Sequence, residues 1–163
     1  MQTKTREPNV RSFEPTARFR TMMRIGNAFM RPLLRSRFGR KIDDLALLSF
    51  TGRRSGRRYT IPVGYHELDG DGVILTASAW KANLRGGADV ELMHHGRRSP
   101  MRAELIEEPH QVARLYSALL RRIVLSKAKL AIGLEVIGDR IPTDEEIEEA
   151  VGGRRAVVVL HPR

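Results

Sequence analysis

Two strand-like segments on either side of a short turn limit the folds open to this chain. Residues 45–51 and 58–68 are rich in aliphatic and β-branched side chains, and Gly52 and Gly56 lie between them. Two such runs joined by a few residues that include glycine are typical of an antiparallel hairpin. Glycine also lets a ligand approach the backbone closely. The segment therefore predicts a hairpin whose turn is open to a ligand.

Four arginines lie in or beside this turn: Arg53, Arg54, Arg57 and Arg58. Backbone N–H groups of a tight turn can point the same way and bind an anion. The whole chain has 29 Lys and Arg against 19 Asp and Glu, a net charge of +10, which favours anionic partners. The turn is thus a candidate site for a phosphate or polycarboxylate. A solvated basic hairpin remains the alternative.

Further strands are expected at 72–79, 89–95, 98–107 and 156–160. Asp69-Gly-Asp-Gly72 indicates a hairpin, and Gly96 indicates a second tight turn. The order lacks the regular strand–helix alternation of a parallel sheet. We therefore expect a mainly β (α+β) fold in which antiparallel strands close into a small barrel with peripheral helices.

The rest of the chain is expected to be helical or flexible. Residues 1–15 predict a flexible arm, and 16–38 predict an N-terminal amphipathic helix that breaks at Arg31 before Pro32. That helix could cap the barrel, flank a substrate entrance or lie on an anionic membrane. A helix should start at Pro109 and another at the capping box of Thr143, whereas 126–141 are ambiguous. With 163 residues and no visible boundary, we expect a single domain over 1–163.

Several kinds of chemistry are not expected from these residues. The chain has no cysteine, no Gly-x-Ser-x-Gly motif and no acidic cluster with metal-ligand spacing. His94 and His95 would point to opposite faces of a strand, so we expect no metal site. An enzyme built on this chain would need a bound cofactor. With neither a membrane-spanning segment nor a signal peptide in view, we expect a cytoplasmic protein.

The motifs around the turn resemble those of a known family. Thr51-Gly-Arg-Arg-Ser-Gly-Arg57 is followed by a strand with Pro62, then by Ala77-Ser78 and by Trp80-Lys-Ala-Asn-Leu-Arg85. Their order and spacing resemble the deazaflavin-dependent nitroreductase/quinone reductase family, from about Phe19 to Arg102. The resemblance implies a split β-barrel that binds reduced 8-hydroxy-5-deazaflavin, coenzyme F420. FMN is the less favoured cofactor.

The resemblance also implies a set of cofactor-binding residues. They are Arg53, Arg54, Ser55, Gly56, Tyr59, Thr60, Ile61, Pro62, Val63, Gly64, Ala77, Ser78, Trp80, Asn83 and Leu84. The turn that carries the four arginines, called the Gly-Arg turn below, would hold the phosphate and the anionic tail. The strand that follows it would lie along the deazaflavin ring. Ala77 and Ser78 would contact the edge of the ring, and the segment that begins at Trp80 would close the pocket. The chain departs from the family pattern in two places. Trp80 follows Ser78 almost at once, and Tyr59 stands where many members have a basic residue.

The leading hypothesis is an oxidoreductase in which reduced deazaflavin transfers a hydride to a small, hydrophobic, planar acceptor such as a quinone or nitroaromatic. Ser78, Tyr65, Tyr116 or solvent could supply the proton. A non-catalytic flavin, deazaflavin or lipid carrier is the first alternative. A nucleic-acid-binding module is weaker, because only Tyr59 could stack on bases near the arginines. A homodimer and a peripheral membrane contact stay open.

Overall fold

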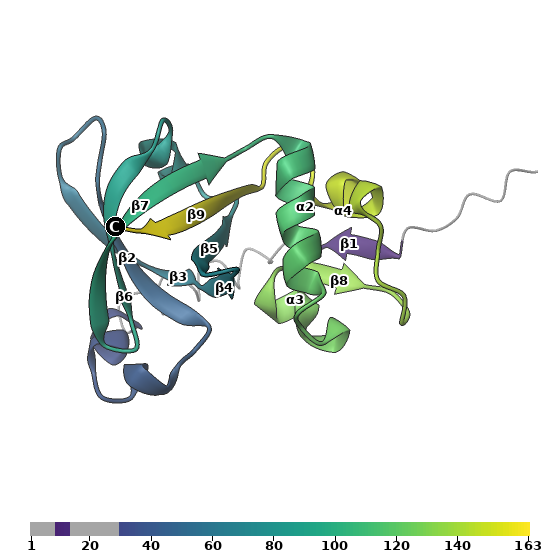
Figure 1. Ribbon diagram of the computed structural model, residues 1–163, viewed down its shortest axis with the longest axis horizontal. Helices are drawn as coiled ribbons and strands as arrows, with labels where there is room; N and C mark the ends of the chain where they lie inside the picture. The colour runs from purple at the N-terminus through teal and green to yellow at the C-terminus, as the bar shows by residue number, and fades with distance from the viewer. Residues whose placement is uncertain (1–8, 14–29) are drawn as a thin grey trace, which may run out of the picture. The chain divides into compact units, whose positions relative to one another are not determined.

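The computed structural model describes residues 9–13 and 30–163. The chain forms two compact units, one of Met1–Glu14 with Glu108–Arg154 and one of Pro15–Glu107 with Arg155–Arg163 (Figure 1). The expectation that they act as a single domain stays a prediction. Each unit is described by itself below.

The strand-rich unit contains all seven strands of the larger sheet. Its elements are η1 (Gly39–Lys41), β2 (Leu45–Thr51), β3 (Arg58–Gly64), β4 (His66–Leu68), β5 (Asp71–Thr76), η2 (Ala79–Leu84), β6 (Ala88–His94), β7 (Arg97–Ile106) and β9 (Ala156–Pro162). Five of the seven strands have bounds within three residues of those of a predicted segment. The exception is the predicted strand 58–68, which the structure divides into β3 and β4.

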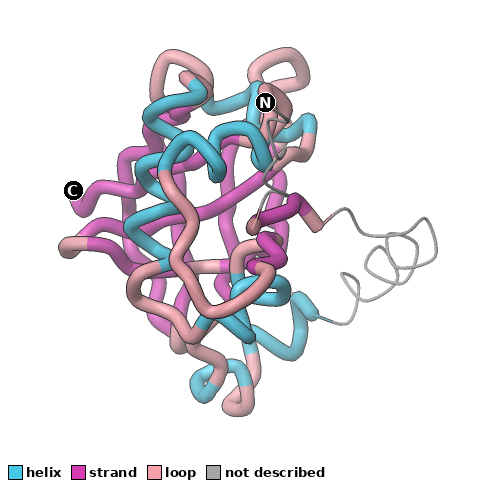
Figure 2. Tube along the Cα trace, turned by 90° about the vertical axis from the view of Figure 1, so that its right-hand side faces the viewer, coloured by secondary structure: helices cyan, strands magenta, loops and turns pink. Residues whose placement is uncertain are grey.

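One antiparallel sheet of seven strands organises this unit. Its order is β3-β2-β6-β7-β9-β5-β4, and the sheet curls into a half-barrel (Figures 1 and 2). Alternate side chains point inward, so Ala46, Leu48 and Phe50 of β2 meet Val158 and Leu160 of β9 in one core cluster. The predicted mainly β, split-barrel fold is confirmed.

Tyr65 explains why the long predicted strand is divided. Its backbone N–H donates to the carbonyl of Asp44 over 3.0 Å, at the point where the pairing of β2 with β3 ends. β4 pairs instead with β5. The Tyr65 ring is buried against Gly72, where an added Cβ would lie 2.7 Å from Tyr65 Cε2. The break was hidden because residues 58–68 are strand-like on both sides of Tyr65.

The predicted N-terminal helix is described only in its last part. Residues 16–29 of that prediction lie outside the described residues, and residues 30–35 are helical without the break expected at Arg31. The helix also ends before the predicted Phe38. Ser36 Oγ donates to the carbonyl of Leu33 over 2.6 Å and accepts from the N–H of Phe38 over 3.2 Å. This side chain satisfies backbone groups at the helix end and replaces the next helical turn.

The second unit combines helices with a small sheet. It contains β1 (Val10–Ser12), α2 (Pro109–Leu120), η3 (Leu125–Lys127), α3 (Ala128–Ala131), β8 (Leu134–Val136) and α4 (Asp144–Val151). β1 lies inside the segment predicted to be a flexible arm. It pairs with β8, and Val10 is 2% exposed opposite Val136. Three residues are too few for periodicity to reveal such a strand.

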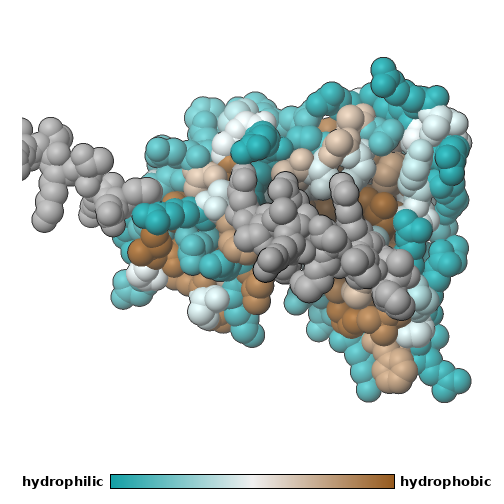
Figure 3. Space-filling model, turned by 180° about the vertical axis from the view of Figure 1, so that it is seen from behind, coloured by the Kyte–Doolittle hydropathy of each residue, from teal (hydrophilic) through white to brown (hydrophobic). Residues whose placement is uncertain are grey.

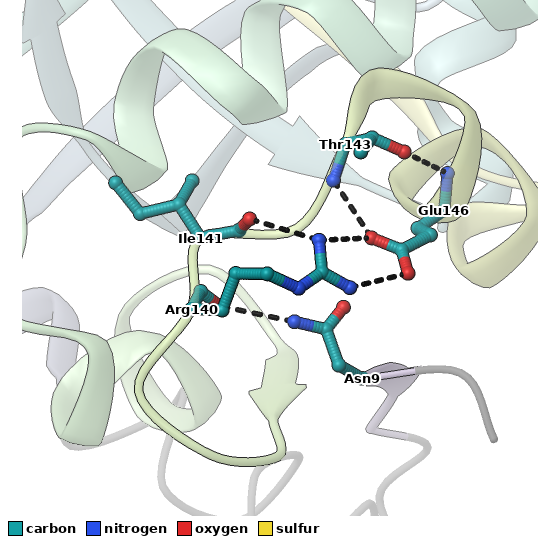
Figure 4. A network of polar contacts seen from close by, with 5 residues as sticks. All are labelled: Asn9, Arg140, Ile141, Thr143 and Glu146. Carbon is teal, nitrogen blue, oxygen red and sulfur yellow. Dashed lines mark hydrogen bonds and ion pairs between the residues drawn. The ribbon is translucent and has the colours of Figure 1, made fainter. Parts of the chain in front are cut away.

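The capping box predicted at Thr143 is present at the start of α4. Thr143 Oγ1 accepts from the N–H of Glu146, and the Glu146 carboxylate accepts from the N–H of Thr143. Arg140 binds the same carboxylate through two nitrogens at 2.7 and 3.0 Å, and Asn9 donates to the carbonyl of Arg140 (Figure 4). A bidentate arginine thus ties the cap to the N-terminal segment.

Hydrophilic residues predominate on the face drawn in Figure 3, as the composition leads one to expect. Among the described helices, none is both long and apolar enough to cross a membrane.

Candidate functional site

The turn between β2 and β3 is closed by its own backbone. The N–H of Gly52 donates to the carbonyl of Arg57 over 2.8 Å, and the N–H of Gly56 donates to the carbonyl of Gly52 over 2.9 Å. Gly52 is needed for space, because an added Cβ would lie 2.6 Å from Ser55 Oγ and 2.7 Å from Tyr59 Cε2. Gly56 is needed for its φ of 65°, and no atom lies within 4 Å of the position its Cβ would take.

Hydrogen-bond donors remain available at the tip of this turn. The backbone N–H groups of Arg54 and Ser55 donate to no group in the described part of the chain. Within the same described residues, the guanidinium groups of Arg54 and Arg57 form no ion pair. Both side chains are exposed. Two free amides beside two unpaired cations match the donor set that an anion requires.

Arg53 has a different position from its neighbour Arg54. Its backbone N–H donates to Asn83 Oδ1 over 3.0 Å, and its Nη1 donates to the carbonyl of Arg85 over 3.1 Å. Asn83 Nδ2 in turn donates to the carbonyl of Trp80 over 2.9 Å. Arg53 therefore fastens the turn to η2, which brings two of the predicted site segments together.

Glu107, which follows β7, holds the far side of η2. Its carboxylate accepts two hydrogen bonds from Arg85 at 2.9 and 3.0 Å and lies 3.3 Å from Lys81 Nζ. Hydrogen bonding from Arg85 and then from Lys81 outweighs desolvation and lowers the pKa of Glu107 to about 2. Sequence analysis missed this residue because 22 residues separate it from Arg85.

An aromatic row joins the same segments on the inner side. Phe50 stacks on Tyr59 with ring centroids 5.8 Å apart and on Trp80 with centroids 5.7 Å apart. Trp80 is half-buried and packs against the core cluster, whereas Leu84 is fully buried within it. Trp80 is therefore part of the packing between η2 and β2, whatever else it contacts.

The predicted residues of β3 are divided between its two faces. Tyr59, Ile61 and Val63 lie on the face of the core cluster, while Thr60 faces away and shares a hydrogen bond with Ser49. Pro62 alternates with Val63 and is half-buried, and Gly64 is exposed with nothing within 4 Å of its would-be Cβ. The side chains of these residues do not share one face, so a ring lying along β3 would meet its backbone and edge.

Ala77 and Ser78 follow the end of β5 and are exposed, as is Ala79. The N–H of Ser78 donates to Thr76 Oγ1 over 3.0 Å. Of the three candidate proton donors, Tyr65 is 6% exposed and Tyr116 is 1% exposed. Burial raises the pKa of Tyr65 to about 12, and Glu67 adds to the rise. Only the Ser78 hydroxyl of these three is accessible.

The expected orientation of His94 and His95 is wrong. Their ring centroids are 3.9 Å apart, because β6 ends at His94 and His95 begins a turn with a φ of 51°. His94 Nε2 and His95 Nδ1 each lie 2.8 Å from a backbone carbonyl, of Asp43 and Arg40 respectively. No group of three or more potential metal ligands gathers within residues 9–13 and 30–163.

Comparison with known proteins decides the family. A family model described as "F420H(2)-dependent quinone reductase" matches residues 22–129, which is more than half of the chain. The chain belongs to this family. The resemblance seen in the turn and Trp motifs is thereby confirmed. No curated protein matches the sequence significantly.

Solved structures give weaker likenesses. An F420-H2 dependent reductase is 15% identical with a TM-score of 0.43, covering 72% of this chain and 94% of its own. A conserved hypothetical protein of Mycobacterium tuberculosis is 16% identical with a TM-score of 0.47, covering 93% and 83%. An FMN-binding protein of Nostoc punctiforme, related to pyridoxamine 5'-phosphate oxidase, is 15% identical with a TM-score of 0.48, covering 91% and 83%. At these values the assignment depends on the family model alone.

Proposed function

We propose that this protein is an oxidoreductase that uses coenzyme F420 and reduces a quinone or nitroaromatic. The family match over residues 22–129 carries this proposal, and the donor set of the Gly-Arg turn supports it. When bound, the reduced cofactor supplies a hydride from C5 of its deazaflavin ring. The chain itself would bind, orient and shield the reactants.

The residues of the turn fit the anionic part of this cofactor, a phosphodiester followed by glutamates. The free N–H groups of Arg54 and Ser55 would hold phosphate oxygens, and Arg54 and Arg57 would supply permanent positive charge. The open space at Gly56 would let the phosphate approach the backbone. Tyr59 brings no charge, so Arg57 and Arg54 would replace the basic residue that many family members have at that position.

The ring would lie along the β3 backbone between Thr60 and Gly64, with Ala77 and Ser78 at its edge. Trp80 and Asn83 would hold η2 against the turn, because both are fixed there by contacts with Phe50 and Arg53. Ser78 Oγ is the accessible hydroxyl from which a proton could reach the acceptor. With Tyr65 and Tyr116 buried, solvent is the other source.

Steady-state assays of the purified protein test this proposal. We expect reduced F420 to be oxidised in the presence of menadione, with little turnover when reduced nicotinamide replaces it. The chain has no Gly-rich βαβ unit to bind a dinucleotide. Rapid turnover with nicotinamide and none with reduced F420 would contradict the cofactor assignment.

The exposure of Ala77, Ser78 and Ala79 favours one second candidate, a non-catalytic carrier of the same cofactor. A cofactor bound beside such an open segment would be less shielded from water. Tight binding of F420 without turnover with any quinone or nitroaromatic would favour the carrier.

A further inference from the structure

A hollow of about 210 Å³ lies on the outward face of the sheet, where β3, β2 and β6 run side by side. Ser49 of β2 is the centre of its floor, because the strand register places it between Thr60 and Glu91. Leu47 and Met93, which are also opposite each other, form its apolar part. These side chains alternate with those of the core cluster, so the hollow lies outside the barrel.

Positive charge is in excess around this hollow. Arg58 Nη2 and Arg98 Nη1 lie 3.0 and 3.4 Å from the same oxygen of Glu91. Arg35 also lines the hollow and pairs with no acidic group in the described residues. Three arginines against one glutamate leave two positive charges uncompensated. Each guanidinium has five N–H donors, so most of their donors are available.

The floor can supply one more donor. Ser49 Oγ and Thr60 Oγ1 are 2.8 Å apart, and Ser49 is 8% exposed. The two hydroxyls have two hydrogens between them, and their mutual hydrogen bond uses one. The other hydrogen can be donated to a ligand in the hollow.

These features point to a small ligand with an oxyanion group. Pockets for drug-sized ligands usually measure about 300–1,000 Å³, so this hollow is too small for the whole deazaflavin cofactor. It also lies on the face of β3 opposite Tyr59, away from the free amides of Arg54 and Ser55. We propose that the hollow binds the carboxylate or phosphate group of a small molecule, held by Arg98, Arg58 and Arg35 above the Ser49–Thr60 pair. The proposal does not depend on the cofactor assignment, although Thr60 also belongs to the predicted cofactor-binding residues.

Titration of the full-length protein, followed by NMR, tests the proposal. Inorganic phosphate and succinate are added separately in low-chloride buffer, and the amide signals of Ser49, Thr60 and Glu91 are compared with that of Gly56. We expect saturable shifts at the first three with at least one anion, and the anion that saturates identifies the preferred group. The absence of saturation there with both anions would overturn the proposal.

Matched variants locate the binding. Arg98→Gln should weaken it by about tenfold or more, the scale of a lost charged hydrogen bond. Arg97→Gln removes the same charge from the neighbouring position, which does not line the hollow, and should leave the affinity within about twofold. Equal weakening by both would contradict the proposal, because it would mean nonspecific charge attraction.

Glu91→Gln should strengthen the binding of the anion, whereas Arg98→Gln should weaken it. It removes the carboxylate that competes for Arg58 and Arg98, so the added anion should bind several-fold more tightly. Weaker binding would contradict the proposal. In Arg54→Ala, the added anion should shift the signals of Ser49 and Thr60 as it does in the wild type. If it abolishes their shifts, the anion site is the turn rather than the hollow.

Discussion

Arg53 and Arg54 are neighbours in the sequence, yet the structure gives them different surroundings. Arg53 is fixed to Asn83 and the carbonyl of Arg85, whereas Arg54 binds no group among the described residues. The sequence predicted a basic, glycine-bearing turn but treated its arginines alike. It could not separate them, because the partners of Arg53 lie 30 and 32 residues away.

This difference predicts opposite effects on stability. Asn83→Ala removes the acceptor of the Arg53 N–H and the donor to the Trp80 carbonyl, so it should lower the free energy of unfolding by about 1–2 kcal/mol. Arg54→Ala should change it by less than about 0.5 kcal/mol, as is usual for exposed positions. Urea unfolding of the two variants checks this, and a larger loss for Arg54→Ala would contradict the assigned roles.

The raised pKa of Tyr65 predicts that the stability of the protein depends on pH in the alkaline range. Its pKa is raised from 10.0 to about 12 by burial and by Glu67, so the folded state retains this proton more strongly than the unfolded state. The resulting stabilisation is complete below pH 10 and is lost as the pH rises through about 12. Tyr65→Phe should therefore lose less stability than the wild type between these pH values. Unfolding curves across the window with equal slopes for both proteins would contradict this.

At the level of elements, predictions were accurate where a long strand-forming run ends at a clear turn residue, and they failed where tertiary contacts decide. β2 was predicted at its observed bounds, because seven strand-forming residues end at Gly52. The break at Tyr65 depends on a hydrogen bond to Asp44, and the helix end depends on Ser36, so neither is visible in periodicity. β1 forms only because β8, more than a hundred residues later, supplies its partner.

Glu107 joins the end of β7 to η2 through its contacts with Arg85 and Lys81, which we call the clamp. This clamp predicts how the stability of the protein changes at acidic pH. The pKa of Glu107 is lowered from 4.5 to about 2, chiefly by hydrogen bonding from Arg85. Its stabilisation is present above pH 4.5 and is lost as the pH falls through about 2. Glu107→Gln should therefore lower the melting temperature at neutral pH and flatten its decline over this acidic range.

Glu149→Gln is the matched control, because Glu149 is exposed and forms no ion pair within the described residues. Both variants remove one negative charge. If Glu149→Gln lowers the melting temperature as much as Glu107→Gln, net charge rather than the clamp is responsible.

At the scale of the whole molecule, the net charge of +10 and the exposed arginines of the turn both predict that cofactor binding depends on salt. An anionic cofactor should be attracted over several ångströms and should bind more weakly as salt screens that attraction. We expect the affinity for F420 to fall between low and moderate ionic strength, and to fall less steeply for Arg54→Ala. Salt-independent binding would contradict the electrostatic role of the turn.

Direct titration of F420, followed by its fluorescence, is the most direct test of the account. The wild type should bind it, and Arg54→Ala should bind about tenfold or more weakly, corresponding to a lost charged hydrogen bond of about 1.5 kcal/mol. Arg97→Ala removes an exposed arginine outside the turn and should bind like the wild type. Equal affinities for the wild type and Arg54→Ala would contradict the claim that the Gly-Arg turn holds the cofactor.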